Sequence, residues 1–551
     1  MLTRICTITK QPFIISDQEE AFCKNAGIPL PTIAPYERLR NMLGFYNSIF
    51  LYSSTCELTK KPMLSIVPPT KETKAYDTAV WMDENAWDPL IYGRDFDFER
   101  PFFEQFRELQ LGVPTPSRSV VLSTMENSDY TNGISNAKNC YLIFDSNEAE
   151  DCYFSYQLTK VKNIVDSIGI RYSELCYSCR YVDYCYNLRF AENCVHCSDS
   201  MFLFNCRGLK NCYGCTNLNH KEYCWYNEQL TPNEFETKYK QLNLGSQIDL
   251  AREKTKFAEF KKKAFVKEFN GVSNEKSSGN YLNECKNCTY TFFTDRAEDC
   301  EYCLRAINGK NCFFYTIFGL NAEFIYNSQT CGHNVYNLKF CLGCFVNAHD
   351  LEYCMHVGFG SNNCFGCIGL RKKEYCILNK QYSKDDYFVM VEKIKKHMLA
   401  TGEYGQWYPN HFSPCYYNKS EAISFFPLTK DEAISRGFSW EDEEVEEFEQ
   451  TYTIPDNINE VKDDILQETL KCPVSGKKYR IIKQELDLYR RFQLPIPRIA
   501  PLERLRLNCL TLQMPTLVDR ECGNCKTMIT TAYSDPEQTV YCERCYSEKT
   551  A

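Results

Sequence analysis

The chain has 551 residues, with 63 Lys and Arg against 72 Asp and Glu, for a formal net charge of −9 at pH 7. This length is enough for about three to five domains, and 44% hydrophobic residues with 25% charged residues exclude a disordered chain. The negative charge excludes a protein that coats DNA by charge alone. The unusual feature is the cysteine content of 33 residues, an odd number.

These thiols can form disulfides, bind metal ions or pack as small apolar residues. Disulfides need an oxidising compartment, which is reached through a signal peptide. The N-terminus MLTRICTITK has no long apolar region and no small-residue cleavage site, and no run of about 18 apolar residues occurs in the chain. We therefore expect a cytoplasmic protein with reduced thiols and no contact with a membrane.

Residues 1–66 are expected to form a small α+β module like a zinc ribbon, because residues 466–551 repeat them at a constant offset of 466. Cys6 matches Cys472, Cys56 matches Cys522, and the segments 28–40 and 494–506 share the pattern Ala-Pro-x-Glu-Arg-Leu-Arg. In the N-terminal copy Thr59 stands where a second thiolate would follow Cys56. This copy is therefore expected to fold with a degenerate metal site.

The connecting segment 67–136 contains Arg94-Asp95-Phe96-Asp97-Phe98-Glu99, in which acidic and aromatic residues alternate. If this stretch is extended, Asp95, Asp97 and Glu99 share one face and could hold a hard cation or act as an acid–base pair. An edge strand with one solvated face is the favoured alternative.

Two repeat modules are predicted at 137–228 and 280–379. Lys138-Asn139-Cys140 recurs at a spacing of 12 as Glu150-Asp151-Cys152, and a second series starts at Lys286-Asn287-Cys288, 148 residues later. The offset has grown to 152 at the end of the modules, as a few one-residue insertions would produce. We infer an internal duplication.

Within one repeat, Cys140, Leu142 and Phe144 alternate with other residues, and this period of two predicts a short strand. Short strands that recur every 9–12 residues, with Asn, Asp and Gly between them, predict a β-solenoid in which equivalent residues stack with Cys inward. The fold class is thus mainly β, with duplicated solenoid-like modules. Whether one coil contains 12 or about 24 residues stays open.

The repeat cysteines, 11 from Cys140 to Cys224 and 12 from Cys285 to Cys376, are interpreted mainly as small core residues. Ile164 and Phe324 occupy the cysteine position of their repeats, which suits an apolar core. Seven Cys-x-x-Cys pairs keep zinc, iron–sulfur or redox chemistry open as alternatives. In an extended strand the two thiols of such a pair would face opposite sides.

A helix is predicted after each repeat module. In the helical linker 229–275, Thr231, Pro232 and Glu234 form a start signal, and Ser383 is its counterpart in the helix and connecting segment 380–438, where Thr429 and Glu432 cap a further helix. The lysine-rich stretch Lys254–Lys267 is interpreted as a solvated helix face, with a nucleic-acid contact as the alternative.

Residues 439–465 are acidic and are expected to be a linker to the C-terminal module. In that module Cys522, Cys525, Cys542 and Cys545 form two Cys-x-x-Cys pairs separated by sixteen residues. Four thiolates at this spacing are typical of a structural zinc site that has no open position for a substrate. One Zn²⁺ per chain is therefore expected.

Several long motifs support a resemblance that extends over nearly the whole chain. They include Trp87-Asp88-Pro89, the segment 92–98, Asn127-Ser128-Asp129-Tyr130 and the segment 540–546. With these motifs the chain resembles cysteine/tyrosine-repeat proteins with terminal zinc-ribbon modules from candidate-phyla bacteria. The resemblance implies no activity, and it implies an N-terminal metal site of which only Cys6 remains, because Thr9, Ala34 and Glu37 replace the other cysteines.

Candidate catalytic residues are few. His196 and His333 lie close to cysteines in sequence, and no phosphate-binding loop, dinucleotide fingerprint or hydrolase elbow occurs. We expect a scaffold or binding protein rather than an enzyme, with a protein partner or self-assembly as its target. The alternatives are a nucleic-acid-binding protein that uses Arg38, Arg40, Arg504 and Arg506, an enzyme on the solenoid face and a thiol-rich metal store.

Overall fold

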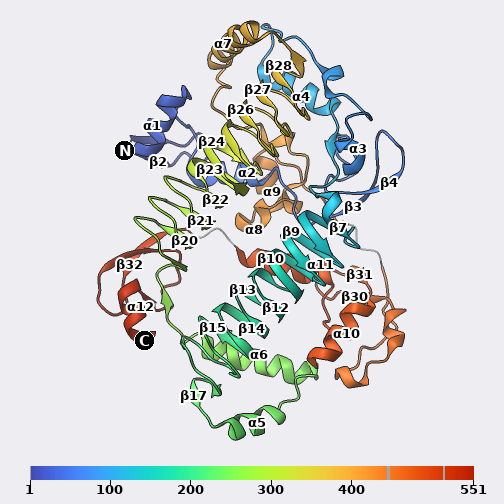
Figure 1. The fold of residues 1–551 in the computed structure, drawn as a ribbon, viewed down its shortest axis with the longest axis vertical. Helices are drawn as coiled ribbons and strands as arrows, with labels where there is room; N and C mark the ends of the chain where they lie inside the picture. The colour runs from blue at the N-terminus through green and yellow to red at the C-terminus, as the bar shows by residue number, and fades with distance from the viewer. Residues whose placement is uncertain (1, 444–446, 513–515, 551) are drawn as a thin grey trace.

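The computed structural model describes residues 2–443, 447–512 and 516–550. It contains two β-solenoids, each built from parallel strands, with small α+β modules packed around them (Figure 1). This arrangement confirms the predicted fold class. The two solenoids run in opposite directions, because Tyr281 at the start of the second contacts Asn193 late in the first, whereas Arg305 contacts Asp145 early in the first.

The strands of the two solenoids follow one another in space almost in chain order. The first consists of β7 (Met125–Glu126), β8 (Thr131–Lys138), β9 (Tyr141–Glu150), β10 (Tyr153–Val165), β11 (Ile168–Arg171), β12 (Glu174–Tyr177), β13 (Arg180–Asp183), β14 (Tyr186–Val195) and β15 (Ser198–Phe204). The second consists of β19 (Gly271–Val272), β20 (Gly279–Asn283), β21 (Thr291–Asp295), β22 (Leu304–Ile307), β23 (Lys310–Leu320), β24 (Ala322–Gln329), β25 (Val335–Lys339), β26 (His349–Glu352), β27 (Asn362–Phe365) and β28 (Glu374–Ile377).

One coil of the first solenoid contains 12 residues, since Tyr153 pairs with Tyr141 and Glu174 with Lys162. In the second solenoid four successive steps contain 13 residues, beginning with Lys310 to Glu323 and ending with His349 to Asn362. These four insertions account for the growth of the offset from 148 to 152. They also show that the assignment of Phe324 to a cysteine position was wrong, because Ile325 pairs with Cys312 and fills that buried position.

The period of the coil is three residues, and the predicted period of two was wrong. Every third residue has a positive φ, as at Asn139, Leu142, Asp145 and Glu148, so the chain turns a corner there. The residue after each corner points inward: Cys140, Ile143 and Ala149 are almost fully buried. Four sides of three residues make one 12-residue coil, and the two thiols of a Cys-x-x-Cys pair both face the core.

Asn and Asp are frequent at the corners because they tolerate the left-handed conformation. They also bond to their equivalents in the next coil, as Asn139 does to Asp151 at 3.1 Å. Glycine occurs where a ring from the following coil folds over the corner. At Gly169, with φ of 69°, an added Cβ would lie 2.7 Å from the Tyr181 ring.

The inward cysteines do more than fill space. Cys185 Sγ donates to the carbonyl of Asp183 and accepts the backbone N–H of Cys197 at 3.2 Å. Ser173, one coil earlier, makes the same two contacts with Arg171 O and Cys185 N. Several core positions thus need a side chain that accepts an inward-pointing N–H, and both Cys and Ser provide one.

The predicted helices are present. α5 (Pro232–Lys240) and α9 (Lys430–Ser435) each begin with a complete capping box, and Ser383 caps α7 (Lys384–Ala400). The other α-helices described outside the terminal modules are α3 (Thr78–Met82), α4 (Phe102–Gly112), α6 (Gln247–Lys261) and α8 (Ala422–Phe425). The lysines of 254–267 are partly engaged: Lys261 pairs with Glu192 of the first solenoid at 2.6 Å.

The terminal modules repeat each other in structure. The elements of the N-terminal module are β1 (Leu2–Ile5), β2 (Pro12–Ile15), α1 (Asp17–Ala26), α2 (Pro35–Leu43), β3 (Tyr52–Thr55) and β4 (Pro62–Ser65). In the C-terminal module they are β30 (Leu470–Lys471), β31 (Lys478–Tyr479), α10 (Lys483–Phe492), α11 (Pro501–Cys509), β32 (Val518–Glu521), β33 (Met528–Thr531), β34 (Val540–Tyr541) and α12 (Glu543–Thr550).

The first half of each terminal module docks on the solenoid that is distant from it in sequence, whereas β3 lies beside β7 of the first solenoid and β32 beside β20 of the second (Figure 1). In the N-terminal module Arg38 pairs with Glu19 at 2.6 Å and reaches Asn327 of the second solenoid at 2.8 Å. In the C-terminal module the equivalent Arg504 pairs with Glu485 at 3.2 Å and with Asp166 of the first solenoid at 3.0 Å. The same ion pair therefore serves both modules in a crossed arrangement.

The predicted segment borders fall inside structural units at two places. The first solenoid already begins with β7, within the range 67–136. Residues 75–82 belong with the turn at Cys56, because Asp77 N donates to Cys56 Sγ. The expected linker 439–465 is packed in its described C-terminal part, where Ile454 and Ile458 are buried and Asp456 bonds to Ser246 at 2.5 Å. Residues 444–446 of this segment lie outside the described residues.

Candidate metal centre and groove

Four cysteine sulfurs lie together in the C-terminal ribbon. Cys522 and Cys525 are on the turn between β32 and β33, and Cys542 and Cys545 are at the start of α12. The four Sγ atoms all lie within 4.8 Å of one another. No other group of three or more Cys, His, Asp or Glu ligand atoms is this close among the described residues.

The geometry of this cluster fits a tetrahedral metal ion. With metal–sulfur bonds of about 2.3 Å, the sulfur–sulfur distance in a tetrahedron is about 3.8 Å, and Cys525 Sγ lies 3.7 Å from Cys542 Sγ. Hydrogen bonds to Thr527 lower the pKa of Cys525 to about 6 and favour its thiolate. The Cys542 N–H also donates to Cys522 Sγ at 3.3 Å. The four cysteines could therefore bind a metal ion.

The ribbon is joined to the segment between the two solenoids. β34 pairs in parallel with β18 (Val266–Lys267), and Thr531 Oγ1 donates to the carbonyl of Glu268 at 2.6 Å. The helix that carries Cys545 also contacts the first solenoid, where Asn219 Nδ2 donates to Thr550 O at 2.7 Å. The metal cluster is thus part of the connection between the solenoids.

Three further turns have the shape of the Cys522 turn without its four thiols. At Cys6, Cys56 and Cys472 the same bond from residue i+4 closes the turn at 2.8–3.0 Å. Ala34 N donates to Cys6 Sγ at 3.3 Å and Asp77 N to Cys56 Sγ at 3.4 Å, just as Cys542 N does to Cys522. Glu37, which replaces one of the expected cysteine ligands, forms ion pairs with Arg436 and Arg40.

The acidic residues of the connecting segment do not form one carboxylate face. The stretch is not a strand: Asp95 pairs with Lys380 at 2.6 Å, and Asp97 accepts the N–H of Glu99 in a turn. Phe96 and Phe98 both pack on His397. Neither an edge strand nor an acid–base pair is formed here.

The Cys/His neighbours in sequence are separated by the wall of the coil. His196 is a corner residue that stacks on Tyr184 with a centroid distance of 5.1 Å, whereas Cys194 and Cys197 point into the core. His333 lies against Phe318 on the outside, and Cys331 is buried inside. These pairs do not place a base against a thiol.

The four arginines considered for nucleic-acid binding are engaged within the protein. Besides the docking contacts of Arg38 and Arg504, Arg40 pairs with Glu37, and Arg506 pairs with Glu503 at 2.5 Å. The docking role was missed from the sequence, although Glu19 and Glu485 also match at the offset of 466. A conserved acid–base pair in both copies was the available signal.

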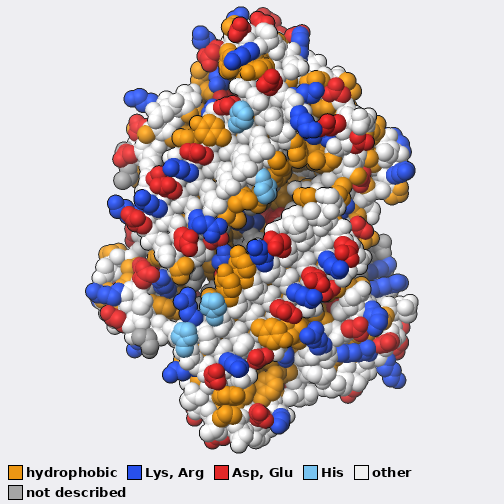
Figure 2. Space-filling view, in the orientation of Figure 1, with side chains coloured by type: hydrophobic (Ala, Val, Ile, Leu, Met, Phe, Trp, Pro, Cys, Tyr) orange, Lys and Arg blue, Asp and Glu red, His pale blue; other side chains and the backbone are white. Residues whose placement is uncertain are grey.

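A groove of about 1410 Å³ runs between the solenoids. The same corner of each solenoid lines it over seven consecutive coils, from Gly133 to Asn205 in the first and from Tyr281 to His356 in the second. Figure 2 shows this hollow as a diagonal depression with apolar side chains along it. Tyr181 packs on Tyr281 across it at 4.1 Å.

A buried polar network closes one part of the groove. Arg305 donates to Glu421 at 3.0 Å and to the hydroxyl of Tyr156 at 2.6 Å, and it lies 3.5 Å from Asp145. Burial, together with the neighbouring charge of Glu421, raises the pKa of Asp145 to about 7. One guanidinium therefore joins both solenoids to the segment that contains Glu421.

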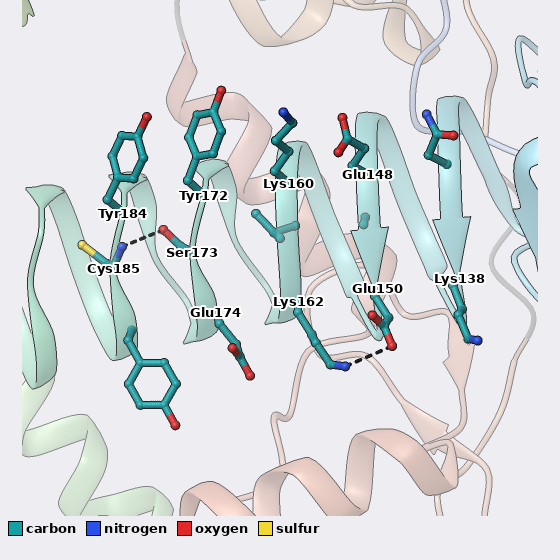
Figure 3. A pocket seen from close by; sticks show the side chains of 14 residues that line it. Lys138, Glu148, Glu150, Lys160, Lys162, Tyr172, Ser173, Glu174, Tyr184 and Cys185 are labelled. Carbon is teal, nitrogen blue, oxygen red and sulfur yellow. Dashed lines mark hydrogen bonds and ion pairs between the residues drawn. The ribbon is translucent and has the colours of Figure 1, made fainter.

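A shallower depression of about 810 Å³ lies on the outer face of the first solenoid (Figure 3). Lys138, Glu150, Lys162 and Glu174 form one row across successive coils, and the Lys162 ammonium pairs with Glu150 at 3.0 Å. Tyr172 and Tyr184 stack at 4.7 Å in a second row. Alternating signs neutralise this row, so the face is not a charged binding patch.

Comparisons with known proteins give little further information. No family model matches the chain, and no curated protein does. One solved structure, described as a "putative acetyltransferase" from Desulfovibrio desulfuricans G20, is 10% identical and is aligned over 46% of this chain and 68% of its own, with a TM-score of 0.11. This similarity carries no conclusion on function. No described helix is both long enough and apolar enough to cross a membrane.

Proposed function

We propose that this protein is a cytoplasmic scaffold in which one structural Zn²⁺ ion holds the segment between the two solenoids. The observation that carries the proposal is the position of the four-cysteine ribbon on that segment. Val266 N donates to Thr539 O at 2.9 Å and Glu268 N to Tyr541 O at 2.8 Å, so β18 is held by the strand that leads to Cys542. Zinc is the ion expected for four thiolates in a closed tetrahedron.

The crossed docking of the terminal modules supports the same role. Arg38 joins the N-terminal module to the second solenoid and Arg504 joins the C-terminal module to the first, and these contacts would oppose rotation of one solenoid against the other. Such a rigid frame suits the presentation of a long surface to another protein, which is the partner we propose. Nucleic acid is less favoured, because the arginines proposed for phosphate contacts are engaged in ion pairs.

The metal and its role can be tested on the full-length chain. We expect about one zinc per chain by elemental analysis, and loss of this zinc in the Cys525→Ser/Cys542→Ser variant. Without zinc, hydrogen exchange in residues 264–270 should rise, because β34 no longer holds β18. Structural zinc binds zinc-finger peptides with an apparent free energy of about 10–16 kcal/mol, so its loss should have a large local effect.

Cys56→Ser is the matched control, because it removes a thiol from a ribbon-like turn that lacks the other ligands. It should leave the zinc content unchanged. Absence of metal, or unchanged exchange in 264–270 after zinc is lost, would contradict the proposed role. Many metal ions per chain would instead favour the thiol-rich metal store.

A further inference from the structure

The groove between the solenoids combines exposed apolar side chains with a surplus of positive charge. At one lip Met82, Val121 and Leu122 are 41%, 50% and 40% exposed. Phe318 and Phe345 of the second solenoid line the same groove. Exposed apolar side chains that gather along one hollow are typical of an interaction site.

The charges of the groove favour an acidic ligand. Its lining has five Lys and Arg side chains against three Asp and no Glu, although the whole chain has a net charge of −9. Arg171 and Arg305 form ion pairs with the three Asp, and Lys267 pairs with Glu543 outside the lining. Of the described carboxylates, none lies within ion-pair distance of Arg118 or Arg207, which also line the groove.

Arg118 is the groove cation whose surroundings most favour binding of a carboxylate. It is partly buried, and its guanidinium Nη1 donates to the backbone carbonyls of Asp129 and Thr131. Its Nε atom is buried without an acceptor, and two more groove-lining groups, the hydroxyls of Tyr181 and Thr330, are buried and unpaired as well. Asp77 and Asp129 are the nearest negative charges, and burial lowers the pKa of Arg118 despite them.

The dimensions of the groove fit an extended chain rather than a small molecule. Its volume exceeds the range of about 300–1,000 Å³ that is typical of small-molecule pockets. Seven coils at a spacing of about 4.8 Å give a length of about 29 Å. An extended peptide covers this length with about nine residues.

We propose that the groove binds an extended segment of a partner protein that contains apolar side chains and at least one carboxylate. Apolar side chains of the segment would pack against the lip formed by Met82, Val121 and Leu122, and a carboxylate would pair with Arg118. This proposal deepens the proposed scaffold function and rests on it, because the groove exists only while the solenoids are held together.

The test uses the full-length protein and a fluorescein-labelled decapeptide of alternating Leu and Glu, with binding measured by fluorescence anisotropy. We expect saturable binding of this peptide and at least tenfold weaker binding when its Leu residues are replaced by Ser or its Glu residues by Lys. Val121→Ser/Leu122→Ser should weaken binding of the original peptide at least tenfold. Arg118→Gln should weaken it at least fivefold, and should have no effect on a Leu/Gln peptide.

Ile91→Ser and Arg252→Gln are the matched controls, because both side chains are exposed and neither lines the groove. Both should bind the peptide as the unmodified protein does. Absence of saturable binding, equal binding of the Lys peptide, or insensitivity to the lip variants would overturn the proposal. Displacement of the peptide by laurate or by a single-stranded oligonucleotide at equal concentration would also overturn it. Zinc content and exchange of 264–270 in the same preparation show separately whether the scaffold itself is intact.

Discussion

The inward cysteines can be tested for their role as hydrogen-bond acceptors by substitution with serine and with alanine. Cys185 is buried, and its sulfur accepts the N–H of Cys197 at 3.2 Å. Cys185→Ser replaces the sulfur by a smaller oxygen, whereas Cys185→Ala removes the γ atom and leaves a larger cavity. Only Ser keeps an acceptor for the Cys197 N–H and a donor for the carbonyl of Asp183.

The expected difference follows from the cost of an unpaired buried amide. Leaving a buried donor without an acceptor costs about 1–3 kcal/mol. Cys185→Ala should therefore be less stable than Cys185→Ser by about 1–2 kcal/mol, and the same pair of substitutions at Cys176 corrects for the difference in cavity size. If the thiol were only a small apolar core residue, the order would be reversed, since burial of a hydroxyl is less favourable than burial of a methyl group.

Cys176 is the matched control position. It stands between Ile164 and Leu188 in its stack, and the Leu188 N–H makes a weaker contact with its sulfur than the Cys197 N–H makes with that of Cys185. Serine should therefore have a smaller advantage over alanine there.

The assay combines equilibrium unfolding in urea with hydrogen exchange of the peptide that contains residue 197. Faster exchange of this peptide in Cys185→Ala than in Cys185→Ser is expected. The explanation fails if Ala is as stable as Ser at position 185, or if Ser has the same advantage at position 176.

Two further predictions concern the groove network and the corners. Because the pKa of Asp145 is about 7 in the folded protein and about 3.9 in an unfolded chain, the folded state binds this proton more tightly, and its stability should fall as pH rises from about 4 to 7. Asp145→Asn should reduce this fall, measured as urea midpoints at pH 5 and 7.5. If the pH dependence of stability is unchanged in this variant, its assignment to Asp145 is wrong. Burial also raises the pKa of Glu301 to about 7, so Glu301 should still contribute to the fall in stability in the variant. Gly169→Ala should lower the free energy of unfolding by about 1–3 kcal/mol more than Gly402→Ala, because both have positive φ but only Gly169 faces a ring within 4 Å; equal losses in thermal unfolding would show that the Tyr181 ring moves aside freely.

Local spacing was sufficient to predict a large part of the architecture. The 12-residue repeat, the duplication of both modules, the helix caps at Thr231 and Thr429 and the gathering of Cys522, Cys525, Cys542 and Cys545 follow from short-range patterns. Such patterns work because a parallel solenoid brings equivalent residues of neighbouring repeats into contact. The charges follow the same pattern, because Lys138, Glu150 and Lys162 are equivalent residues of neighbouring coils and alternate in sign.

The period within each repeat could not be derived in this way. The alternation of Cys140, Leu142 and Phe144 resembles a flat strand, and only the positive φ at every third residue turns it into a coil with four corners. Leucine and phenylalanine at such corners contradict local preference, and the stacking of neighbouring coils compensates for this cost. For the same reason the inserted residue near Phe324 was misplaced by counting alone.

The 33 cysteines and the two duplications were decided by the sequence itself, because they depend on spacing along the chain. The crossed docking of the modules, the burial of Arg38 and Arg504 and the groove between the solenoids were decided only by the tertiary structure. These features join residues hundreds of positions apart, such as Arg504 and Asp166, and no periodicity records which distant surfaces meet. The physical reason is that stacking is a nearest-neighbour interaction, whereas docking depends on the shape and charge of complete folded surfaces.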